Sequence, residues 1–270
     1  MAEKVDLYNS SYGKYELDVY RKVRLETYGE DFGQTSWVTT EESREIPKLL
    51  EMTADSRVLE IGCGSGRYAL HLAEQTGCEI AGLDINTHGI DNARRLAQEA
   101  GLNHAKFQKC DVSKGLPFSD NSFDAIFAND VLCHIRGRSA IFAEIGRVLK
   151  PMARFLFSDA LVIGGIVSDQ EIAARSSIGY YEFSPPGENE RLLRDAGFEI
   201  LSVTESSGAA AEIAKRRHDS REKYKTELAA AEGESNYQGQ QRFLWCVHQL
   251  SSEKRLLRFV YLSRKTEQSP

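Results

Sequence analysis

The chain has 270 residues, of which 41% are hydrophobic, and a formal net charge of -6. This is enough apolar material for a sizeable core, and the acidic balance argues against wrapping nucleic acid, which relies on Lys and Arg to displace counterions. No stretch approaches the roughly 18 to 20 apolar residues of a membrane span, and residues 1–6 lack the apolar run of a signal peptide. We therefore expect a cytoplasmic monomer or homodimer with no membrane or nucleic-acid partner.

The five cysteines contain no closely spaced pair of the kind that binds a metal or forms a disulfide framework. We therefore expect no metal cofactor, and chemistry that needs clustered thiolates is disfavoured. The cysteines are Cys63, Cys78, Cys110, Cys133 and Cys246.

The first 52 residues are predicted to form a helical lid. A helix should begin at Thr39 or Thr40, because Glu41 and Glu42 then lie in its first turn, where the helix dipole favours acidic side chains. The preceding segment contains Trp37 and is rich in tyrosine, with Tyr8, Tyr12, Tyr15, Tyr20 and Tyr28.

Short apolar runs then alternate with helical segments, a pattern typical of an α/β fold with helices on both faces of a mostly parallel sheet. The predicted domain covers residues 53–270, with inserts at about 162–186 and 206–254. The expected strands are residues 57–61, 79–84, 105–110, 123–129, 154–160, 198–204 and 258–263.

A glycine-rich loop follows the first expected strand, in the order Glu60-Ile61-Gly62-Cys63-Gly64-Ser65-Gly66, and a helix should start near Tyr68. Glycine permits positive φ and has no Cβ, so a ligand can approach bare backbone amides at the start of that helix. The third glycine falls at Gly66, where a nicotinamide fingerprint would need it one residue later, at Arg67. A dinucleotide cofactor is thus disfavoured.

Asp84 ends the second expected strand, where a carboxylate in such folds accepts the ribose hydroxyls of a nucleotide. Asp is also a good N-cap, so Asp84 could instead cap the helix expected around Thr87. The pairing with the glycine loop favours the ribose interpretation.

This motif order resembles the class I S-adenosylmethionine-dependent methyltransferases, and the resemblance extends over about residues 50 to 204. Asp111-Val112, the stretch 116–126 and Leu149-Lys150-Pro151 match later motifs of the family. The resemblance implies a Rossmann-like sheet of seven strands whose last strand is antiparallel and lies beside the sixth. It implies S-adenosylmethionine as cofactor, S-adenosylhomocysteine as product, and contacts from Glu60, Gly62, Cys63, Gly64, Gly66, Asp84, Ile85, Asp111, Val112 and Asn129.

The two inserts are expected to decide which substrate binds. The first holds Arg175, Tyr180 and Tyr181 and should lie over the methyl donor. The second is long, polar and helical, and its composition favours a solvated cap over direct substrate contact.

His134 is the candidate base, because it follows the fourth strand at the edge of the sheet where ligands bind. Alternatively, it only packs there and hydrogen-bonds a backbone carbonyl. Phosphoethanolamine methyltransferases resemble this chain in having a tyrosine lid and a histidine at this place, which implies Tyr15 as its catalytic partner, with Tyr12 as a rival. Ala160 stands where that family has a phosphate-binding tyrosine, which weakens the case for a phosphobase. Sarcosine and dimethylglycine methyltransferases are similar in layout, and Arg175 would suit a carboxylate.

The sequence therefore predicts an enzyme that methylates a small molecule at an amine nitrogen. An O- or C-methyltransferase and a non-catalytic donor-binding module remain alternatives. Arsenic methylation is disfavoured by the scattered cysteines, and methylation of nucleic-acid bases by the sequence Asn129-Asp130-Val131-Leu132, which lacks a proline pair, and by the acidic charge.

Overall fold

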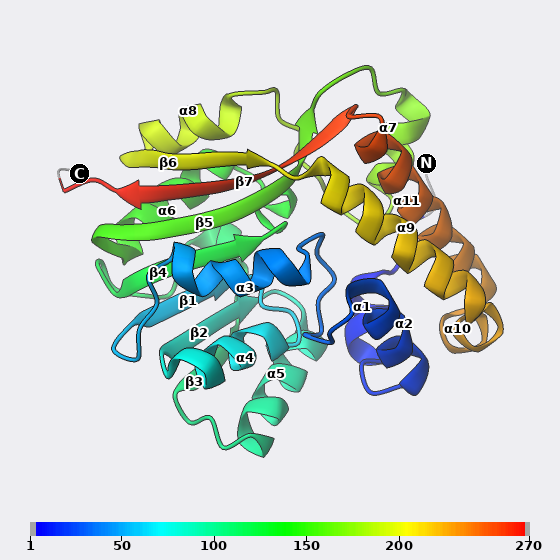
Figure 1. Cartoon of the computed structure of the whole chain (residues 1–270), viewed down its shortest axis with the longest axis horizontal. Coiled ribbons are helices and arrows are strands. Elements are labelled where there is room, and N and C mark those ends of the chain that lie inside the picture. Colours follow the sequence, from blue (N-terminus) through cyan, green and yellow to red (C-terminus); the bar gives the residue numbers. More distant parts are fainter. Residues whose placement is uncertain (1–3, 268–270) are drawn as a thin grey trace.

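The structure, a computed structural model, describes residues 4–267, so residues 1–3 of the predicted lid and 268–270 of the predicted domain lie outside the described residues. The described part forms a single seven-stranded sheet in the order β3-β2-β1-β4-β5-β7-β6 (Figure 1). The strands are β1 (Arg57–Ile61), β2 (Glu79–Asp84), β3 (Ala105–Lys109), β4 (Phe123–Asn129), β5 (Leu149–Ile163), β6 (Phe198–Glu205) and β7 (Leu256–Lys265).

The predicted fold class is confirmed. Strands β1 to β5 pair in parallel, whereas β7 is antiparallel to both β5 and β6, between which it lies. Strand β5 begins five residues earlier than expected, because Leu149 pairs with Phe123 before a bulge interrupts the ladder. The matched motif Leu149-Lys150-Pro151 is therefore part of the strand.

Helices cover both faces of the sheet, as the alternating pattern predicts. On one face, α3 (Thr40–Leu49), α4 (Arg67–Thr76) and α5 (Thr87–Glu99) share a buried apolar cluster with the strands. On the other face lie α6 (Arg138–Val148) and α8 (Glu188–Asp195), which pack on the phenylalanines of β4 and β5. Strands β1, β2 and β4 and the second half of β5 are buried from both sides, which explains their continuous apolar runs.

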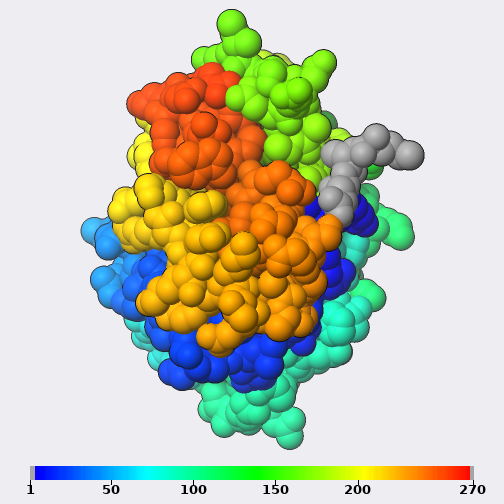
Figure 2. Space-filling view, turned by 90° about the vertical axis from the view of Figure 1, so that its right-hand side faces the viewer, coloured from blue at the N-terminus to red at the C-terminus, as the bar shows by residue number. Residues whose placement is uncertain are grey.

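A third group of helices stands beyond one end of the sheet and brings together segments far apart in the chain (Figure 1). Its members are α1 (Tyr8–Gly13), α2 (Asp18–Tyr28), α7 (Asp169–Arg175), α9 (Ser207–Lys223), α10 (Lys225–Glu232) and α11 (Glu234–Ser252). Figure 2 shows α9 to α11, in yellow and orange, covering this end above the blue N-terminal helices.

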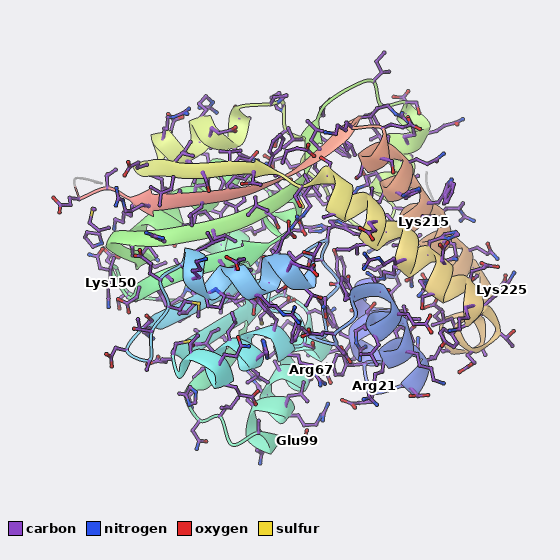
Figure 3. All side chains as sticks on the ribbon, in the orientation of Figure 1. Arg21, Arg67, Glu99, Lys150, Lys215 and Lys225 are labelled. Atoms are coloured by element: carbon purple, nitrogen blue, oxygen red, sulfur yellow. The ribbon has the colours of Figure 1, made fainter. Side chains whose placement is uncertain are left out.

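The helical insert has a polar outer side and an apolar inner side. Figure 3 shows Lys215 and Lys225 on its outer side, and both are exposed. On the inner side, Phe243 and Ile213 are buried in a cluster that includes Leu7. The expectation of a merely solvated cap is therefore incomplete, since one face of the insert belongs to the core. No helix within residues 4–267 has the length and apolar character needed to span a membrane.

Candidate active site

A cavity of about 900 Å³ opens at the carboxyl ends of the parallel strands, where ligands bind in such sheets. Its floor is formed by the ends of β1, β2 and β4, and its roof by the N-terminal segment and the residues around α7. This volume is at the upper end of the range for a single ligand, so two small molecules can lie in it together.

Backbone geometry explains the glycine at the start of the loop after β1. Gly62 has φ of +76°, and a Cβ there would lie 2.2 Å from a methyl carbon of Val131. Its N–H donates to the carbonyl oxygen of Leu83 over 2.7 Å, which ties the loop to the end of β2. Gly62 and Cys63 both line the cavity.

Gly64 and Gly66, which were predicted to contact the cofactor, lie behind the cavity wall. A Cβ on Gly64 would lie 2.4 Å from the hydroxyl of Tyr12, and one on Gly66 would lie 2.5 Å from Cβ of Ala93. These glycines shape the loop by allowing close packing, and Gly66 is the residue from which α4 starts.

Asp84 presents its carboxylate at the cavity and does not cap α5. It accepts hydrogen bonds from the N–H groups of Gly64 at 2.8 Å and Asn86 at 2.7 Å. The N-cap of α5 is Asn86, whose side chain accepts from Gly89. Burial raises the pKa of Asp84, so the group sits in a poorly hydrated place where a ligand hydroxyl would be a strong partner.

Glu60 ends in the cavity wall without a partner for one of its oxygens. Its side chain is 4% exposed, and Oε2 makes no hydrogen bond within the described part of the chain. Burial and the neighbouring Asp84 carboxylate raise the pKa of Glu60 to about 8. A buried carboxyl group of this kind favours the approach of a cation.

The other predicted cofactor residues lie along the same wall. Ile85 exposes 64% of its surface, and Val112 and Asn129 also line the cavity. Asp111 lines it too, with one oxygen accepting from the backbone and hydroxyl of Ser113. The wall thus offers an apolar surface beside acidic groups.

His134 also lines the cavity, where it pairs with Tyr8. The Tyr8 hydroxyl lies 2.9 Å from Nε2, and Nδ1 lies 3.1 Å from the carbonyl oxygen of Tyr180. Burial and the positive charge of Arg175 lower the pKa of His134 to about 4, while burial raises the pKa of Tyr8 well above its usual value. Both groups are therefore neutral near pH 7, and the backbone contact expected for a merely packed histidine is present as well.

The predicted partner Tyr15 lies elsewhere, so its pairing with His134 was wrong. Tyr15 packs under the guanidinium of Arg24, 4.3 Å from the ring centroid, and its hydroxyl accepts from Arg67 at 3.5 Å. The reason is that α1 ends at Gly13, so Tyr15 leaves the helix face that carries Tyr8. The rival Tyr12 lines the cavity but bonds to the hydroxyl of Thr35.

Arg175 is buried between aromatic rings near His134, since both contact the ring of Tyr181. Its guanidinium carbon lies 4.4 Å from the Tyr181 ring centroid, 5.2 Å from Phe243 and 5.9 Å from Trp37. The side chain is 1% exposed, Nη1 has no hydrogen-bond partner, and no carboxylate of residues 4–267 forms an ion pair with it.

Tyr8, Trp37 and Phe243 are among the cavity residues that were not assigned a role from sequence. Tyr8 shares a face of α1 with Tyr12 at helical spacing, which was a usable signal. Trp37 follows a glycine-containing loop, and Phe243 lies on the apolar side of α11, where Leu244 and Val247 continue the periodic pattern. Among residues 4–267, no group of three or more His, Cys, Asp or Glu side chains is placed to hold a metal ion.

Comparison with known proteins identifies the class. Residues 52–177, which include the glycine loop, Asp84, Asp111 and His134, match the family model described as a methyltransferase domain. A methyltransferase domain thus covers residues 52–177, and the resemblance to S-adenosylmethionine-dependent methyltransferases is confirmed.

Its relatives include enzymes with different acceptors. O-methyltransferase resE of Aspergillus sclerotiorum is 30% identical over 64% of this chain and 66% of its own length. Phosphoethanolamine N-methyltransferase 3 of Arabidopsis thaliana is 28% identical over 78% of this chain and 42% of its own length. The chain thus spans less than two thirds of these relatives.

A solved structure with the same fold is phosphoethanolamine N-methyltransferase 2 of Haemonchus contortus, in complex with phosphomonomethylethanolamine and S-adenosylhomocysteine. It superposes with a TM-score of 0.79 at 21% identity, over 97% of this chain and 61% of that one.

Proposed function

We propose that the protein transfers the methyl group of S-adenosylmethionine to a small-molecule acceptor, at an amine nitrogen. The observation that carries this proposal is that Glu60 and Asp84 line the same cavity as Tyr8, His134 and Arg175. In this proposal the donor binds at Glu60 and Asp84, the donor end, and directs its reactive carbon toward the Tyr8, His134 and Arg175 group, the acceptor end.

The donor end offers complementary groups for each part of S-adenosylmethionine. The unpartnered Oε2 of Glu60 suits the ammonium of the methionine moiety, and the Asp84 carboxylate suits the ribose hydroxyls. Ile85 supplies an apolar surface for the adenine, and Asp111 supplies an acceptor for its amine. Predicted contacts from Gly62, Cys63, Val112 and Asn129 are consistent with their places in the wall.

Methyl transfer from a sulfonium is a direct displacement, so no covalent intermediate on the protein is required. The protein must align the acceptor nitrogen, the methyl carbon and the sulfur, and exclude water. The predicted lid supports this role, because Val5 donates from its backbone to Ser177 over 2.9 Å and closes the N-terminal segment over the cavity.

The Tyr8 and His134 pair is suited to orient the acceptor and remove its proton. The Tyr8 oxygen donates to His134 and can still accept from an acceptor N–H. As the new N–C bond forms, the nitrogen becomes more acidic, and its proton can pass through Tyr8 to Nε2.

Arg175 supports an acceptor that carries an anionic group. A buried guanidinium without a carboxylate costs several kcal/mol, and a ligand anion on Nη1 would remove that cost. Tyr181 and Tyr180 frame the same place. Ala160, which also lines the cavity, has no hydroxyl to donate to an anion near Arg175. This smaller set of donors favours a carboxylate over a phosphate.

O-methylation is the second candidate, since resE is named an O-methyltransferase and the Tyr8 and His134 pair could accept a hydroxyl proton equally well. A non-catalytic module is opposed by Glu60, which is buried, and by Asp84, which is partly buried, since both line the cavity.

The test is a transfer assay with methyl-labelled donor over amines, amino acids, phosphobases and phenols. We expect label on a nitrogen of a carboxylate-bearing amine, and label only on oxygen would contradict the amine assignment. Asp84→Ala should weaken S-adenosylhomocysteine binding by about 10- to 100-fold, as expected for a lost charge-assisted hydrogen bond. Failure of S-adenosylhomocysteine to bind the wild-type protein would refute the proposed function.

A further inference from the structure

A buried ion cluster joins four elements beside the cavity. Arg258 on β7 is 1% exposed, and its Nε donates to Asp130 at 3.0 Å while Nη1 donates to both oxygens of Glu42 at 2.8 and 3.1 Å. Nη1 also donates to the hydroxyl of Ser206, which precedes α9. The planar fork of arginine presents donors in fixed directions and here serves two carboxylates at once.

Asp130 links this cluster to the roof of the cavity. It follows β4 with φ of +56°, a strained conformation for a residue other than glycine, and lines the cavity. Its Oδ2 accepts the backbone N–H of Trp37 at 2.8 Å, while Arg258 holds Oδ1. Arg258 thus orients the carboxylate that fastens the loop before α3 to the sheet.

Trp37 in turn forms part of the wall around Arg175. The indole is 5% exposed, lies 6.1 Å from the Phe243 ring centroid, and is one of the three aromatic rings near the guanidinium. A shift of its backbone would open this end of the cavity to solvent.

We propose that Arg258 is a positioning residue of the acceptor site, which fixes Trp37 against Arg175 through Asp130 and keeps the Asp130 charge from the acceptor. The inference rests on the proposed function in one respect: the proposed function assigns the part of the cavity around Arg175 and Trp37 to the acceptor. Arg258 itself does not line the cavity, so it acts through Asp130.

The experiment follows Trp37 directly by fluorescence, in a Trp245→Phe background that leaves Trp37 as the single tryptophan. In Arg258→Met we expect acrylamide to quench Trp37 several-fold more strongly, with unchanged affinity for S-adenosylhomocysteine. Arg258→Lys should restore part of the protection, because it returns a charge but not the fork.

The matched control is Arg138→Met. Arg138 is also buried, pairs with Asp159 at 2.6 Å, and does not line the cavity. It should lower the melting temperature as Arg258→Met does, while leaving Trp37 quenching unchanged. An equal increase in Trp37 quenching in both variants would overturn the proposal, because it would mean that loss of any buried arginine loosens the whole fold.

If Arg258→Met fails to fold, Asp130→Gly is the second variant. Glycine suits the positive φ of residue 130, and Arg258 retains its hydrogen bonds to Glu42 in this variant. It should expose Trp37 in the same way. Unchanged quenching in a folded variant of either kind would refute the proposal. If the wild-type protein does not bind S-adenosylhomocysteine, the proposed function is refuted. The quenching result would still report on how Arg258 positions Trp37.

Discussion

Tyr8 donates its phenolic proton to Nε2 of His134 across 2.9 Å, because Nδ1 of that ring faces the carbonyl oxygen of Tyr180 and must hold the single ring proton. The tautomer is thereby set by the fold. In this tautomer the lone pair on Nε2 points at Tyr8, and the Tyr8 side chain lines the cavity.

Removing either member of this pair should slow turnover without loss of donor binding. We expect Tyr8→Phe and His134→Gln to lower kcat by roughly 100-fold or more, the range for lost general acid–base assistance, because the acceptor loses its proton route. Turnover is measured with the acceptor found in the screen, and donor binding by calorimetry with S-adenosylhomocysteine. Normal turnover in His134→Gln would remove the pair from the mechanism.

Tyr15→Phe is the matched control for this experiment. Its hydroxyl accepts a hydrogen bond from Arg67, and Tyr15 does not line the cavity, so the variant should keep wild-type turnover. A large loss of turnover in Tyr15→Phe would contradict the placement of this residue.

Arg175 should control the proton affinity of His134. Its positive charge is the second cause, after burial, that lowers the pKa of His134 to about 4, so Arg175→Met should raise that pKa. The shift is measured by NMR titration of the imidazole. An unchanged pKa would mean that burial alone accounts for the lowering.

The same low pKa makes stability depend on pH. Between about pH 6.5 and about pH 4 the unfolded chain binds a proton at His134 that the folded protein refuses, so the free energy of unfolding should fall as the pH is lowered through this window. His134→Gln should lose that part of the dependence. Denaturant titrations at several pH values measure it, and identical profiles for both proteins would contradict the assignment.

Binding of S-adenosylhomocysteine should release a proton near pH 7. The Glu60 carboxyl, with a pKa of about 8, is largely protonated in the free protein and would ionise against the ligand ammonium. Calorimetry in buffers of different ionisation enthalpy counts the proton, and release should decline above pH 8. Glu60→Gln should abolish it and weaken binding, whereas release that persists in this variant would point to Asp84.

Two glycines with similar φ should respond differently to alanine. Gly62→Ala places a Cβ 2.2 Å from Val131, so we expect a loss of about 2 to 5 kcal/mol in stability and weaker donor binding. Gly101 has φ of +68° with open space around it, so Gly101→Ala should cost only about 1 to 2 kcal/mol of backbone strain. Unfolding and calorimetry compare them, and equal effects on donor binding would contradict the role given to Gly62.

The sequence predicted the sheet well because each strand carries its own signal. Apolar runs bounded by turns placed β1, β2 and β4 at their observed ends, and the carboxyl-end rule then placed Asp84 and Asn129 at the cavity. Strand β5 differed most at its start, where a bulge and Pro151 obscure the pattern, and β7 extends two residues beyond its predicted bounds at each end.

The acceptor end was harder to predict, because its residues come from segments far apart in the chain. Tyr8 meets His134 across 126 positions, and the helix that carries Tyr8 is only six residues long, too short for periodicity to fix its orientation. Phe243 reaches the cavity because α11 packs against α7 and α9, and no local pattern encodes that contact. Tertiary packing decided these positions.

The place of β7 between β5 and β6 has a consequence for how the chain assembles. Strand β6 is synthesised before β7, but in the sheet it pairs only with β7. Strand β5 also needs β7 to cover its outer edge, so this edge stays open until β7 emerges. Because Arg258 lies on β7, the same late step closes the ion cluster beside the cavity. The sheet should therefore be completed in the same folding event that orders Trp37 beside the cavity.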